Sequence, residues 1–325
     1  MDIVKIAMAA LAGIGIAAAA PALAQEYPAK PINIYVGYSP GDNMDVMTRV
    51  LGQKLEKILG QPITILNKPG GAGSVALSLL AKDKPDGYTL AAVIETPLDR
   101  IPLLRKLDYK PDDFAPVLQF ASGVTGVVVS SKAPWKTFQE LLDYAKKNPA
   151  SFTYATSGAG STMHVAMQYI GVERGLDWTH VPYPGARDTL TAVLGGHINA
   201  AVGSTQWAND VRQGNLKLLA IVGNERMASF PDVPTTKELG FNFSASSASV
   251  IVARAGTPQP IIDKLDKAFR TAMDDPEFVK TVKNLELDVL YRDNQKLKTY
   301  LADTMTQFKA VIEELKLPTE FNTSK

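Results

Sequence analysis

Short apolar runs alternate with amphipathic stretches through the first third of the chain. Residues 32–38, 62–66 and 88–94 are apolar runs of the length and composition typical of buried strands. Between them, residues 46–59 carry apolar side chains at helical spacing, and residues 75–82 form a shorter helical stretch. This βαβαβ order predicts a parallel, doubly wound α/β sheet, because parallel strands need a crossover connection that is usually a helix.

The same alternation restarts in the middle of the chain, after strand-like runs at residues 114–120 and 124–130. The predicted elements that follow are helices at 137–147, 162–173 and 187–194 and strands at 152–155, 180–182, 198–202 and 216–222. The last part is predicted to contain a strand at 249–253 and helices at 258–273, 276–285 and 294–315. The restart predicts a second α/β unit, and a length of 325 residues also favours two domains.

Polar residues mark several predicted helix starts. Asp45 stands where the N-cap of the first helix is expected. Thr137 and Glu140 have the spacing of a capping box, in which the two side chains bond backbone amides reciprocally. Thr235 and Glu238 repeat that spacing, so a further helix start is predicted there.

The N-terminal segment has the order of a secretory signal peptide. Lys5 precedes an apolar run over residues 6–20, and the small residues Ala22 and Ala24 follow it. We therefore predict export, with cleavage after Ala24. A membrane anchor is the alternative, but the run is shorter than the ~20 residues that span a bilayer.

The composition excludes several function classes. A formal net charge of +1 argues against a nucleic-acid-binding surface, so we expect no nucleic-acid partner. The chain has no cysteine, which excludes disulfides, thiol nucleophiles and thiolate metal sites. Its three histidines, His164, His180 and His197, do not have metal-ligand spacing, and we expect neither a metal nor a cofactor.

Loops that connect a strand to a helix are the strongest candidates for a ligand site. A helix N-terminus presents unpaired N–H groups and a partial positive charge, and glycine and serine leave these groups open to a carboxylate. The candidates in the loops at 39–45, 156–162 and 183–187 are Ser39, Gly41, Asn43, Asp45, Thr156, Ser157, Gly158, Gly160, Ser161, Thr162, Tyr183, Gly185, Ala186 and Arg187. A single loop of this composition is more often a plain tight turn.

Other motifs carry weaker signals. The glycine-rich stretch 70–74 resembles a phosphate-binding loop but lacks the Gly-Lys-Ser/Thr ending, so we interpret it as a turn that serves packing. Arg187, Arg49 and Arg100 are candidates for holding an anion through a side chain. For Arg187, a ligand contact and a solvated position in the first helical turn are equally compatible with the sequence.

An exported hydrolase is a competing function. Ser161 and His164 lie one helical turn apart, but the chain has no G-x-S-x-G motif and no carboxylate nearby in sequence to orient the histidine. A Ser–His pair at this spacing on one helix is not a known catalytic geometry. We therefore favour a structural or ligand-orienting role for His164, and we expect no catalytic residue and no enzymatic activity.

Several motifs follow one another in a characteristic order along the chain. They include Pro40-Gly41 with Asp45, Asn67-Lys68-Pro69-Gly70-Gly71, Pro85-Asp86-Gly87-Tyr88, Ser157-Gly158-Ala159-Gly160-Ser161, Pro182-Tyr183, Leu194-Gly195-Gly196-His197 and Pro231-Asp232-Val233-Pro234. Each motif alone is weak. Together, over nearly the whole mature chain, they resemble the substrate-binding proteins of tripartite tricarboxylate transporters, the Bug-type receptors.

The resemblance implies a class II periplasmic binding protein, with two doubly wound α/β lobes joined by two crossing strands. Domain 1 would comprise residues 25–123 and 224–325, and domain 2 residues 124–223. The resemblance also implies a periplasmic location, a monomer, and a small carboxylate ligand that is passed to the membrane permease subunits of a secondary transporter. A sensor that uses the same fold to contact a signalling partner is the alternative that the sequence leaves open.

In the family, the first loop and the serine-glycine loop hold the carboxylate through backbone amides, hydroxyl groups and ordered waters rather than through a salt bridge. At the positions that match these two loops, the resemblance assigns ligand contacts to Ser39, Gly41, Asp45, Ser157, Gly158, Gly160, Ser161 and Thr162. Thr96 and Ser204, which follow two further predicted strands, and His164, on the helix after the second loop, complete the predicted ligand-binding set.

Departures from the family pattern concern the ligand. Asp42 stands where the family usually has a second glycine, and its carboxylate would repel an anionic ligand unless it points away or pairs with a ligand amine. Residues 247–249 are small where the family often has an aromatic, and residues 201–204 lack an acidic residue that is frequent there. A wider pocket would suit a larger or aromatic diacid.

Overall fold

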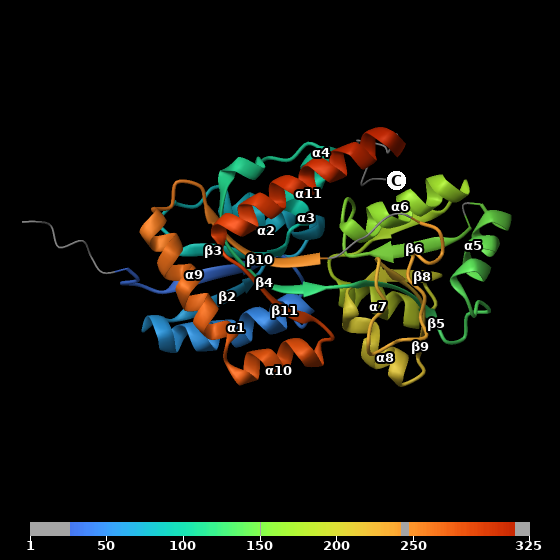
Figure 1. The fold of residues 1–325 in the computed structure, drawn as a ribbon, viewed down its shortest axis with the longest axis horizontal. Coiled ribbons are helices and arrows are strands. Elements are labelled where there is room, and N and C mark those ends of the chain that lie inside the picture. The colour runs from blue at the N-terminus through green and yellow to red at the C-terminus, as the bar shows by residue number, and fades with distance from the viewer. Residues whose placement is uncertain (1–26, 150, 242–246, 316–325) are drawn as a thin grey trace, which may run out of the picture.

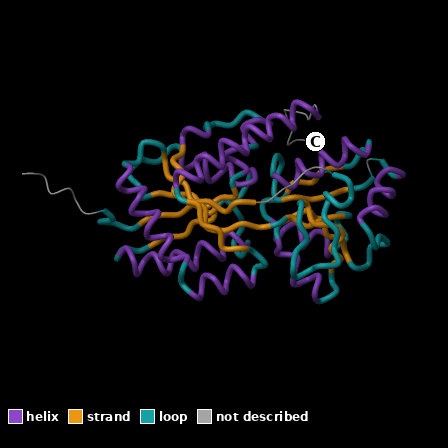
Figure 2. The backbone as a smooth tube through the Cα atoms, viewed as in Figure 1, coloured by secondary structure: helices purple, strands orange, loops and turns teal. Residues whose placement is uncertain are grey.

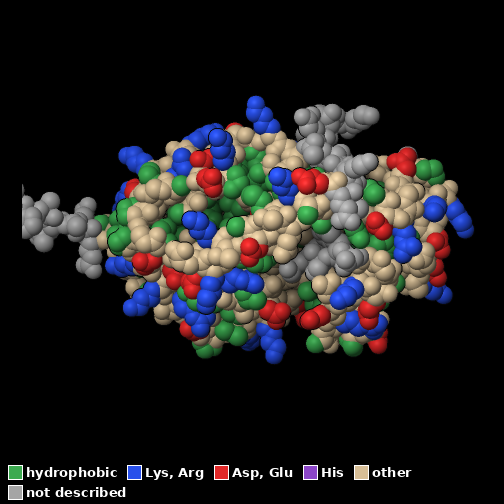
Figure 3. Space-filling view, turned by 45° about the horizontal axis from the view of Figure 1, so that its top comes forward, with side chains coloured by type: hydrophobic (Ala, Val, Ile, Leu, Met, Phe, Trp, Pro, Cys, Tyr) green, Lys and Arg blue, Asp and Glu red, His purple; other side chains and the backbone are tan. Residues whose placement is uncertain are grey.

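The computed structural model describes residues 27–149, 151–241 and 247–315, which form two lobes side by side (Figure 1, Figure 2). The predicted signal peptide and its cleavage site lie outside these residues. Among the described residues, no helix is long and apolar enough to cross a membrane. Basic and acidic side chains are interspersed over the face shown in Figure 3, as expected from the near-neutral net charge.

The first lobe is organised around a mixed sheet of six strands in the order β11-β4-β10-β3-β1-β2. The strands are β1 (Ile32–Val36), β2 (Ile63–Asn67), β3 (Thr89–Ile94), β4 (Phe114–Gly123), β10 (Ser247–Arg254) and β11 (Asp288–Arg292). β1 pairs in parallel with β2 and β3, as the βαβαβ pattern predicts. β10 and β11 are antiparallel to their neighbours, because the chain returns to this sheet from the second lobe.

Helices cover both faces of the first sheet. They are α1 (Asn43–Leu59), α2 (Ser74–Leu80), α3 (Thr96–Asp99), α4 (Ile101–Leu104), α9 (Gln259–Met273), α10 (Pro276–Asn284) and α11 (Asn294–Leu315). Successive residues of β3 alternate between two apolar clusters, because strand side chains point to opposite faces of a sheet. The apolar sides of α1 and α9 belong to one cluster, and those of α2 and α11 to the other.

The second lobe has a five-stranded sheet in the order β7-β6-β8-β5-β9. Its strands are β5 (Thr125–Ser130), β6 (Thr153–Thr156), β7 (Thr179–Pro182), β8 (Ala200–Gly203) and β9 (Leu216–Val222). Its helices are α5 (Phe138–Lys147), α6 (Thr162–Arg174), α7 (Ala186–Leu194) and α8 (Ala208–Arg212). β6 pairs in parallel with β7 and β8, whereas β5 is antiparallel to β8 and β9. The result confirms the expectation of two α/β lobes.

The chain crosses between the lobes where β4 runs into β5, with only Val124 between the two strands. After β9 it stays against the second lobe. The Ile221 N–H donates to the Pro234 carbonyl at 2.9 Å, and the Thr236 N–H donates to the Ile221 carbonyl at 2.8 Å. Residues 234–236 are thus held against β9 of the second lobe, and the predicted domain boundary at residue 224 stays a prediction.

Helix α11 connects the two lobes by packing. In Figure 1 it lies along the top of the molecule, from the first lobe toward the second. Leu297 near its start belongs to an apolar cluster of the first lobe. Phe308 and Ile312 join the core of the second lobe, in the same cluster as Phe138 and Phe241. The C-terminal helix therefore contributes to both cores.

The N-cap of α1 differs from the prediction. The helix begins at Asn43, and its N-cap is Asp42, whose backbone is extended with φ −67° and ψ 158°. Asp45 lies in the first helical turn, where its carboxylate accepts the Gly41 N–H at 2.9 Å. The Asp45 carboxylate thus bonds a residue of the loop that precedes the helix. A carboxylate at the N-cap would instead accept an N–H from the first turn of the helix.

The capping boxes have different outcomes. Thr137 caps α5 as predicted, with the Glu140 N–H donating to its hydroxyl at 3.2 Å. Thr235 and Glu238 exchange the predicted reciprocal bonds at 2.8 and 3.1 Å. They close a turn rather than a helix, so the helix predicted there is wrong. The short helices α3 and α4 and the edge strand β11 are not predicted from the sequence.

Candidate functional site

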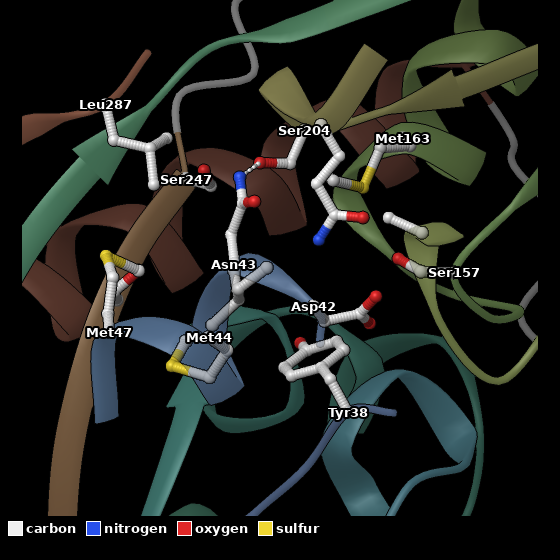
Figure 4. Close-up of a pocket in the computed structure, with 14 residues that line it drawn as sticks. Tyr38, Asp42, Asn43, Met44, Met47, Ser157, Met163, Ser204, Ser247 and Leu287 are labelled. Atoms are coloured by element: carbon white, nitrogen blue, oxygen red, sulfur yellow. Dashed lines mark hydrogen bonds between the residues drawn. The ribbon is translucent and has the colours of Figure 1, made fainter. Parts of the chain in front are cut away.

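A small cavity lies between the two lobes, with a volume of about 30 Å³ (Figure 4). Its lining residues are Tyr38, Asp42, Asn43, Met44, Met47, Ile94, Ser157, Met163, Ala186, Ser204, Gln206, Ser247, Ser249 and Leu287. They come from both lobes, and the polar ones carry hydroxyl, amide or carboxylate groups. A volume of this size holds little more than a water molecule, so the structure represents a closed conformation.

The first loop is held in place by Asp45. The Arg49 Nε donates to its Oδ2 at 3.0 Å, and the Asn67 amide donates to its Oδ1 at 2.8 Å. Burial alone would raise the pKa of Asp45, but the hydrogen bonds from Arg49, Gly41 and Asn67 lower it below its ordinary value. Asp45 and Arg49 therefore position the loop and do not line the cavity.

Asn43 joins the first lobe to the second at the edge of the cavity. Its Nδ2 donates to the Ser204 Oγ and to the Thr205 Oγ1, both at 3.3 Å. Figure 4 shows the Asn43 side chain reaching from the start of α1 toward Ser204. The bond to Ser204 ties together two predicted ligand-binding residues that are far apart in the sequence.

Asp42 is buried in the cavity wall, with 2% of its surface exposed. Its Oδ1 accepts the backbone N–H of Arg187 at 3.2 Å, in the first turn of α7. Its Oδ2 is buried and has no hydrogen-bond partner among the described residues. Burial raises the pKa of Asp42 from 3.8 to about 6, and hydrogen bonds from Arg187 and Gln206 partly offset that effect.

The second loop approaches the first lobe closely. Gly158 has φ +122°, and a Cβ at this position would lie 2.6 Å from the backbone nitrogen of Ala72. Only glycine combines this conformation with this approach. Ala72 belongs to the glycine-rich stretch 70–74, so that stretch serves packing between the lobes, as the sequence interpretation has it. Ser157, the residue before Gly158, lines the cavity.

Ser161 and His164 do not form a catalytic pair. Ser161 is the N-cap of α6, and its Oγ accepts the backbone N–H of His164 at 3.2 Å. The His164 Nδ1 accepts the Gly160 N–H at 3.0 Å, and its Nε2 lies 3.3 Å from the Gln168 amide. Neither ring nitrogen is engaged with the Ser161 hydroxyl, which donates to Thr156 at 3.2 Å.

His164 stacks on His180, with 3.8 Å between the ring centroids. Burial lowers the pKa of His164 well below its ordinary value, and the neighbouring His180 lowers it further. Burial also lowers the pKa of His180, to about 4. Both rings are thus neutral at neutral pH. They contact Gly160 and Thr156 of the second loop and are not among the residues that line the cavity.

Beside the cavity, Thr162 links the second loop to the first lobe. Its Oγ1 lies 3.0 Å from the Thr96 Oγ1 and accepts a hydrogen bond from the Arg100 Nη1 at 2.5 Å. The Arg100 Nη1 also pairs with the buried Glu95 at 2.7 Å. Arg100 is therefore engaged with protein groups and is not available to hold an anion. Thr96 and Thr162 bridge the lobes without lining the cavity.

The third loop closes over the first. The Arg187 Nη2 donates to the Gly41 carbonyl at 3.3 Å, and the Ser39 hydroxyl donates to Asp188 at 3.2 Å. The side chain of Arg187 is exposed. The Tyr183 N–H donates to the Thr156 carbonyl at 2.9 Å, which joins the third loop to the second.

Of the predicted ligand-binding residues, Asn43, Ser157, Ala186 and Ser204 line the cavity. The other predicted residues lie around it, in loop turns, helix caps and contacts between the lobes. Sequence analysis missed the apolar part of the lining, Met44, Met47, Ile94, Met163 and Leu287. These side chains occupy helix and strand positions that the sequence pattern assigns to an ordinary core.

No group of three or more His, Asp or Glu side chains that could hold a metal ion occurs in the described part of the chain. A second cavity lies on the outer face of the first lobe, lined mainly by apolar residues such as Leu98, Phe114 and Leu301. Its described lining residues all belong to the first lobe, unlike those of the cavity described above.

Comparison with known proteins gives a consistent result. The family model described as "Tripartite tricarboxylate transporter family receptor" matches residues 47–317. A UPF0065 protein of Cupriavidus necator is 38% identical over 311 residues, covering 95% of each chain. The structure of the periplasmic binding protein BugD is 25% identical with a TM-score of 0.84, covering 90% of this chain and 99% of BugD.

A second structural relative has a bound ligand. The MatC protein of Rhodopseudomonas palustris, solved with bound malate, is 27% identical with a TM-score of 0.82 and covers 88% of this chain and 100% of its own. These matches extend over both lobes and agree with the sheet topology. The chain therefore belongs to the tripartite tricarboxylate transporter receptor family, a family of periplasmic solute-binding proteins.

Proposed function

We propose that the protein is an exported receptor that captures a small organic carboxylate in the cavity between its lobes and delivers it to the permease subunits of a tripartite tricarboxylate transporter. The observation that carries the proposal is the cavity itself, which takes polar groups from both lobes. A ligand that touches both lobes stabilises the closed arrangement, because it binds that arrangement more tightly than the open one.

The cavity lining suits a carboxylate held by neutral groups. Ser157 and Ser204 from the second lobe and Ser247 and Ser249 from the first offer hydroxyl groups. Among the described residues, no Lys or Arg side chain lines the cavity. Hydroxyl and amide donors in a water-excluded site hold an anion without a salt bridge. The malate bound to the related MatC protein supports a small carboxylate as the ligand class.

The contacts between the lobes support a mechanism of opening and closing. Hydrogen bonds join Asn43 to Ser204, Ser39 to Asp188, and Thr96 to Thr162. With a volume of about 30 Å³, the cavity must enlarge to admit a metabolite. Ligand entry then requires the lobes to separate, and release to a permease requires it again.

The wider functional setting follows from the same proposal. The signal peptide is cleaved after Ala24, and the mature receptor acts in the periplasm as a monomer. Its domain 1 comprises residues 25–123 and 224–325, and its domain 2 comprises residues 124–223. The second candidate function is that of a sensor. A signalling partner, instead of a permease, would then recognise the closed receptor. The hydrolase alternative is disfavoured because the Ser161 hydroxyl donates to Thr156 and both ring nitrogens of His164 are engaged with other groups.

Isothermal titration of the mature protein against a panel of carboxylates, including malate, tests the proposal. We expect saturable binding of at least one compound, with one ligand per chain. Ser157→Ala should weaken that binding by about tenfold, the loss expected for one hydrogen bond to a charged group. Ser78→Ala is the matched control, because Ser78 lies on the first lobe away from the cavity and bonds Asp108.

Two results would contradict the proposal. One is a folded protein that binds no carboxylate of the panel. The other is a Ser157→Ala variant that binds as tightly as the Ser78→Ala control. To separate a transport receptor from a sensor, uptake of the bound compound is measured in vesicles that contain the cognate permease, with and without the receptor.

A further inference from the structure

The cavity contains a carboxylate that the proposed ligand mode does not use. Asp42 lines the cavity and has only 2% of its surface exposed, yet its Oδ2 has no hydrogen-bond partner among the described residues. An ionised oxygen that is buried without a partner is strongly destabilising, so such groups are normally paired. The lone Oδ2 therefore points to a partner that arrives with the ligand.

The other oxygen of Asp42 is held by the second lobe, whose neutral Gln206 side chain and Ala186 N–H also lower the pKa of Asp42 by hydrogen bonding. Its Oδ1 accepts the Arg187 N–H at 3.2 Å at the start of α7, a helix of nine residues. A Cβ at position 185, the N-cap of α7, would lie 2.4 Å from the Asp42 Oδ2, so the glycine there leaves room for the carboxylate. Asp42 thus occupies the helix N-terminus where the loop chemistry favours an anion.

No positive side chain in the cavity balances this carboxylate. Among the described lining residues Asp42 is the only charged one, and the others offer hydroxyl, amide, thioether or aliphatic groups. Of the charged groups on α7, Arg187 directs its guanidinium to the Gly41 carbonyl, and Asp188 accepts a hydrogen bond from Ser39. Tyr38, on the loop before Asp42, donates its hydroxyl to the Ala72 carbonyl at 3.3 Å. The cavity therefore carries one uncompensated negative charge when Asp42 is ionised.

We propose that the ligand is a carboxylate that also carries a protonated amine, and that the ammonium group pairs with the Oδ2 of Asp42. This inference rests on the proposed function and narrows the ligand class within it. The ligand carboxylate is held by the neutral hydroxyl groups of the cavity, and its ammonium group supplies the missing partner. A net-neutral zwitterion leaves the closed cavity with the single negative charge of Asp42 paired.

Electrostatics separates this class from plain diacids. An ammonium–carboxylate bond in a water-excluded site is a charge-assisted hydrogen bond, about twice as strong as a neutral one. A second ligand carboxylate in the same position would place two like charges together, which forces one of them to be protonated. The cavity must enlarge for either ligand, so size does not distinguish the two classes.

The test compares pairs of compounds that differ by one amine. Succinate is paired with aspartate, adipate with 2-aminoadipate, and butyrate with 4-aminobutyrate, each titrated into the mature protein at pH 7.5. We expect the preferred amine-bearing compound to bind about tenfold to a hundredfold more tightly than its partner. In Asp42→Asn, which keeps the shape and removes the charge, this ratio should fall to about one.

A control variant separates contact from long-range charge. Asp188→Asn removes the same charge close by, but Asp188 does not line the cavity. We expect the amine preference to persist in Asp188→Asn, because the surrounding solvent screens a charge that does not touch the ligand. If both variants lose the preference equally, the contact between the ammonium group and Asp42 is refuted.

Proton linkage gives a readout on the wild-type protein alone. At pH 6, close to the pKa of about 6 to which burial raises Asp42, an ammonium ligand should expel a proton from this carboxyl group. A diacid should instead cause proton uptake, since Asp42 must become neutral beside it. Titrations in buffers of different ionisation enthalpy measure the sign, and the Asp42→Asn values are subtracted to remove protons that come from the ligand.

The outcomes are distinct. Proton release together with an amine preference supports the inference. A diacid that binds as tightly as its amine partner, or proton uptake on binding of the preferred ligand, overturns it and leaves the proposed carboxylate receptor intact. If none of the six compounds nor malate binds to folded protein, the proposed function fails, and the inference fails with it.

Discussion

At residue scale, Asp42 lies at the start of two helices that belong to different lobes. It is the N-cap of α1, and it accepts a backbone N–H in the first turn of α7. Both positions favour a negative charge. Burial outweighs them and raises the pKa of Asp42 to about 6. The site therefore combines a carboxylate held in one geometry with a charge that is costly until a partner arrives.

The stability of the unliganded protein should depend on pH through Asp42. The ordinary pKa of this carboxyl group is 3.8, and in the folded protein it is about 6. The folded state therefore binds the proton more tightly than the unfolded state does. The resulting stabilisation is fully present below pH 3.8 and is lost as the pH rises through about 6. We expect Asp42→Asn to raise the free energy of unfolding at pH 8 by about 2–3 kcal/mol.

Denaturant unfolding at pH 8, 7, 6 and 5 measures this effect. As the pH falls, the free energy of unfolding of the wild type should approach that of Asp42→Asn. Asp99, whose pKa burial raises to about 7, adds a dependence of the same sign to both proteins, so the difference between them reports Asp42. Wild-type and variant profiles that run parallel from pH 8 to pH 5 would show that the folded environment does not perturb Asp42.

At element scale, the strand-to-helix loops act as parts of one interface. The second loop approaches the glycine-rich stretch 70–74 so closely that position 158 admits no side chain. The third loop bonds the first through Arg187 and Ser39. From sequence, each loop is a separate candidate. Their joint role depends on how the two sheets face each other, which local composition does not encode.

Gly158→Ala should weaken ligand binding by tenfold or more. The residue has φ +122°, and the new Cβ would lie 2.6 Å from the Ala72 nitrogen in the opposite lobe. Gly175→Ala is the matched control, because Gly175 has φ +61° with nothing within 4 Å. The control should lose only the backbone preference of glycine, about 1 kcal/mol of stability, and keep its affinity. Isothermal titration and denaturant unfolding check both variants, and equal affinities would exclude closure at this contact.

At the scale of the whole molecule, closure depends on contacts outside the cavity. Arg100, Glu95 and Asp99 form a buried charged cluster in the first lobe, and Arg100 extends from it to Thr162 in the second. Helix α11 packs into both cores, and the hydroxyl of its Thr304 donates a hydrogen bond to the Asp99 Oδ2 at 2.7 Å. The lobes are therefore coupled through a buried polar network and a shared helix as well as through the ligand.

Thr162→Val should lower affinity although Thr162 does not line the cavity. The substitution leaves the buried Arg100 without one acceptor and Thr96 without its partner, which costs about 1–3 kcal/mol in the closed state. Ligand binding should weaken by about tenfold, and small-angle scattering should show a larger radius of gyration for the unliganded variant. Thr191→Val is a suitable control, since Thr191 is exposed and its hydroxyl donates to the Arg187 carbonyl within the same helix. A Thr162→Val protein with wild-type affinity would show that this contact does not contribute to closure.

The alternation of apolar runs determined two α/β units and the pairs of parallel strands, because a strand–helix–strand connection admits few arrangements. The order of the motifs identified the family. The composition of the loops identified four residues that line the cavity, Asn43, Ser157, Ala186 and Ser204. Only the tertiary structure decided that Ser161 and His164 are a helix cap and a stacked ring, that Asp45 holds a loop, and that Asp42 faces the cavity. Those roles depend on distances between segments far apart in the chain, which periodicity within a segment does not contain.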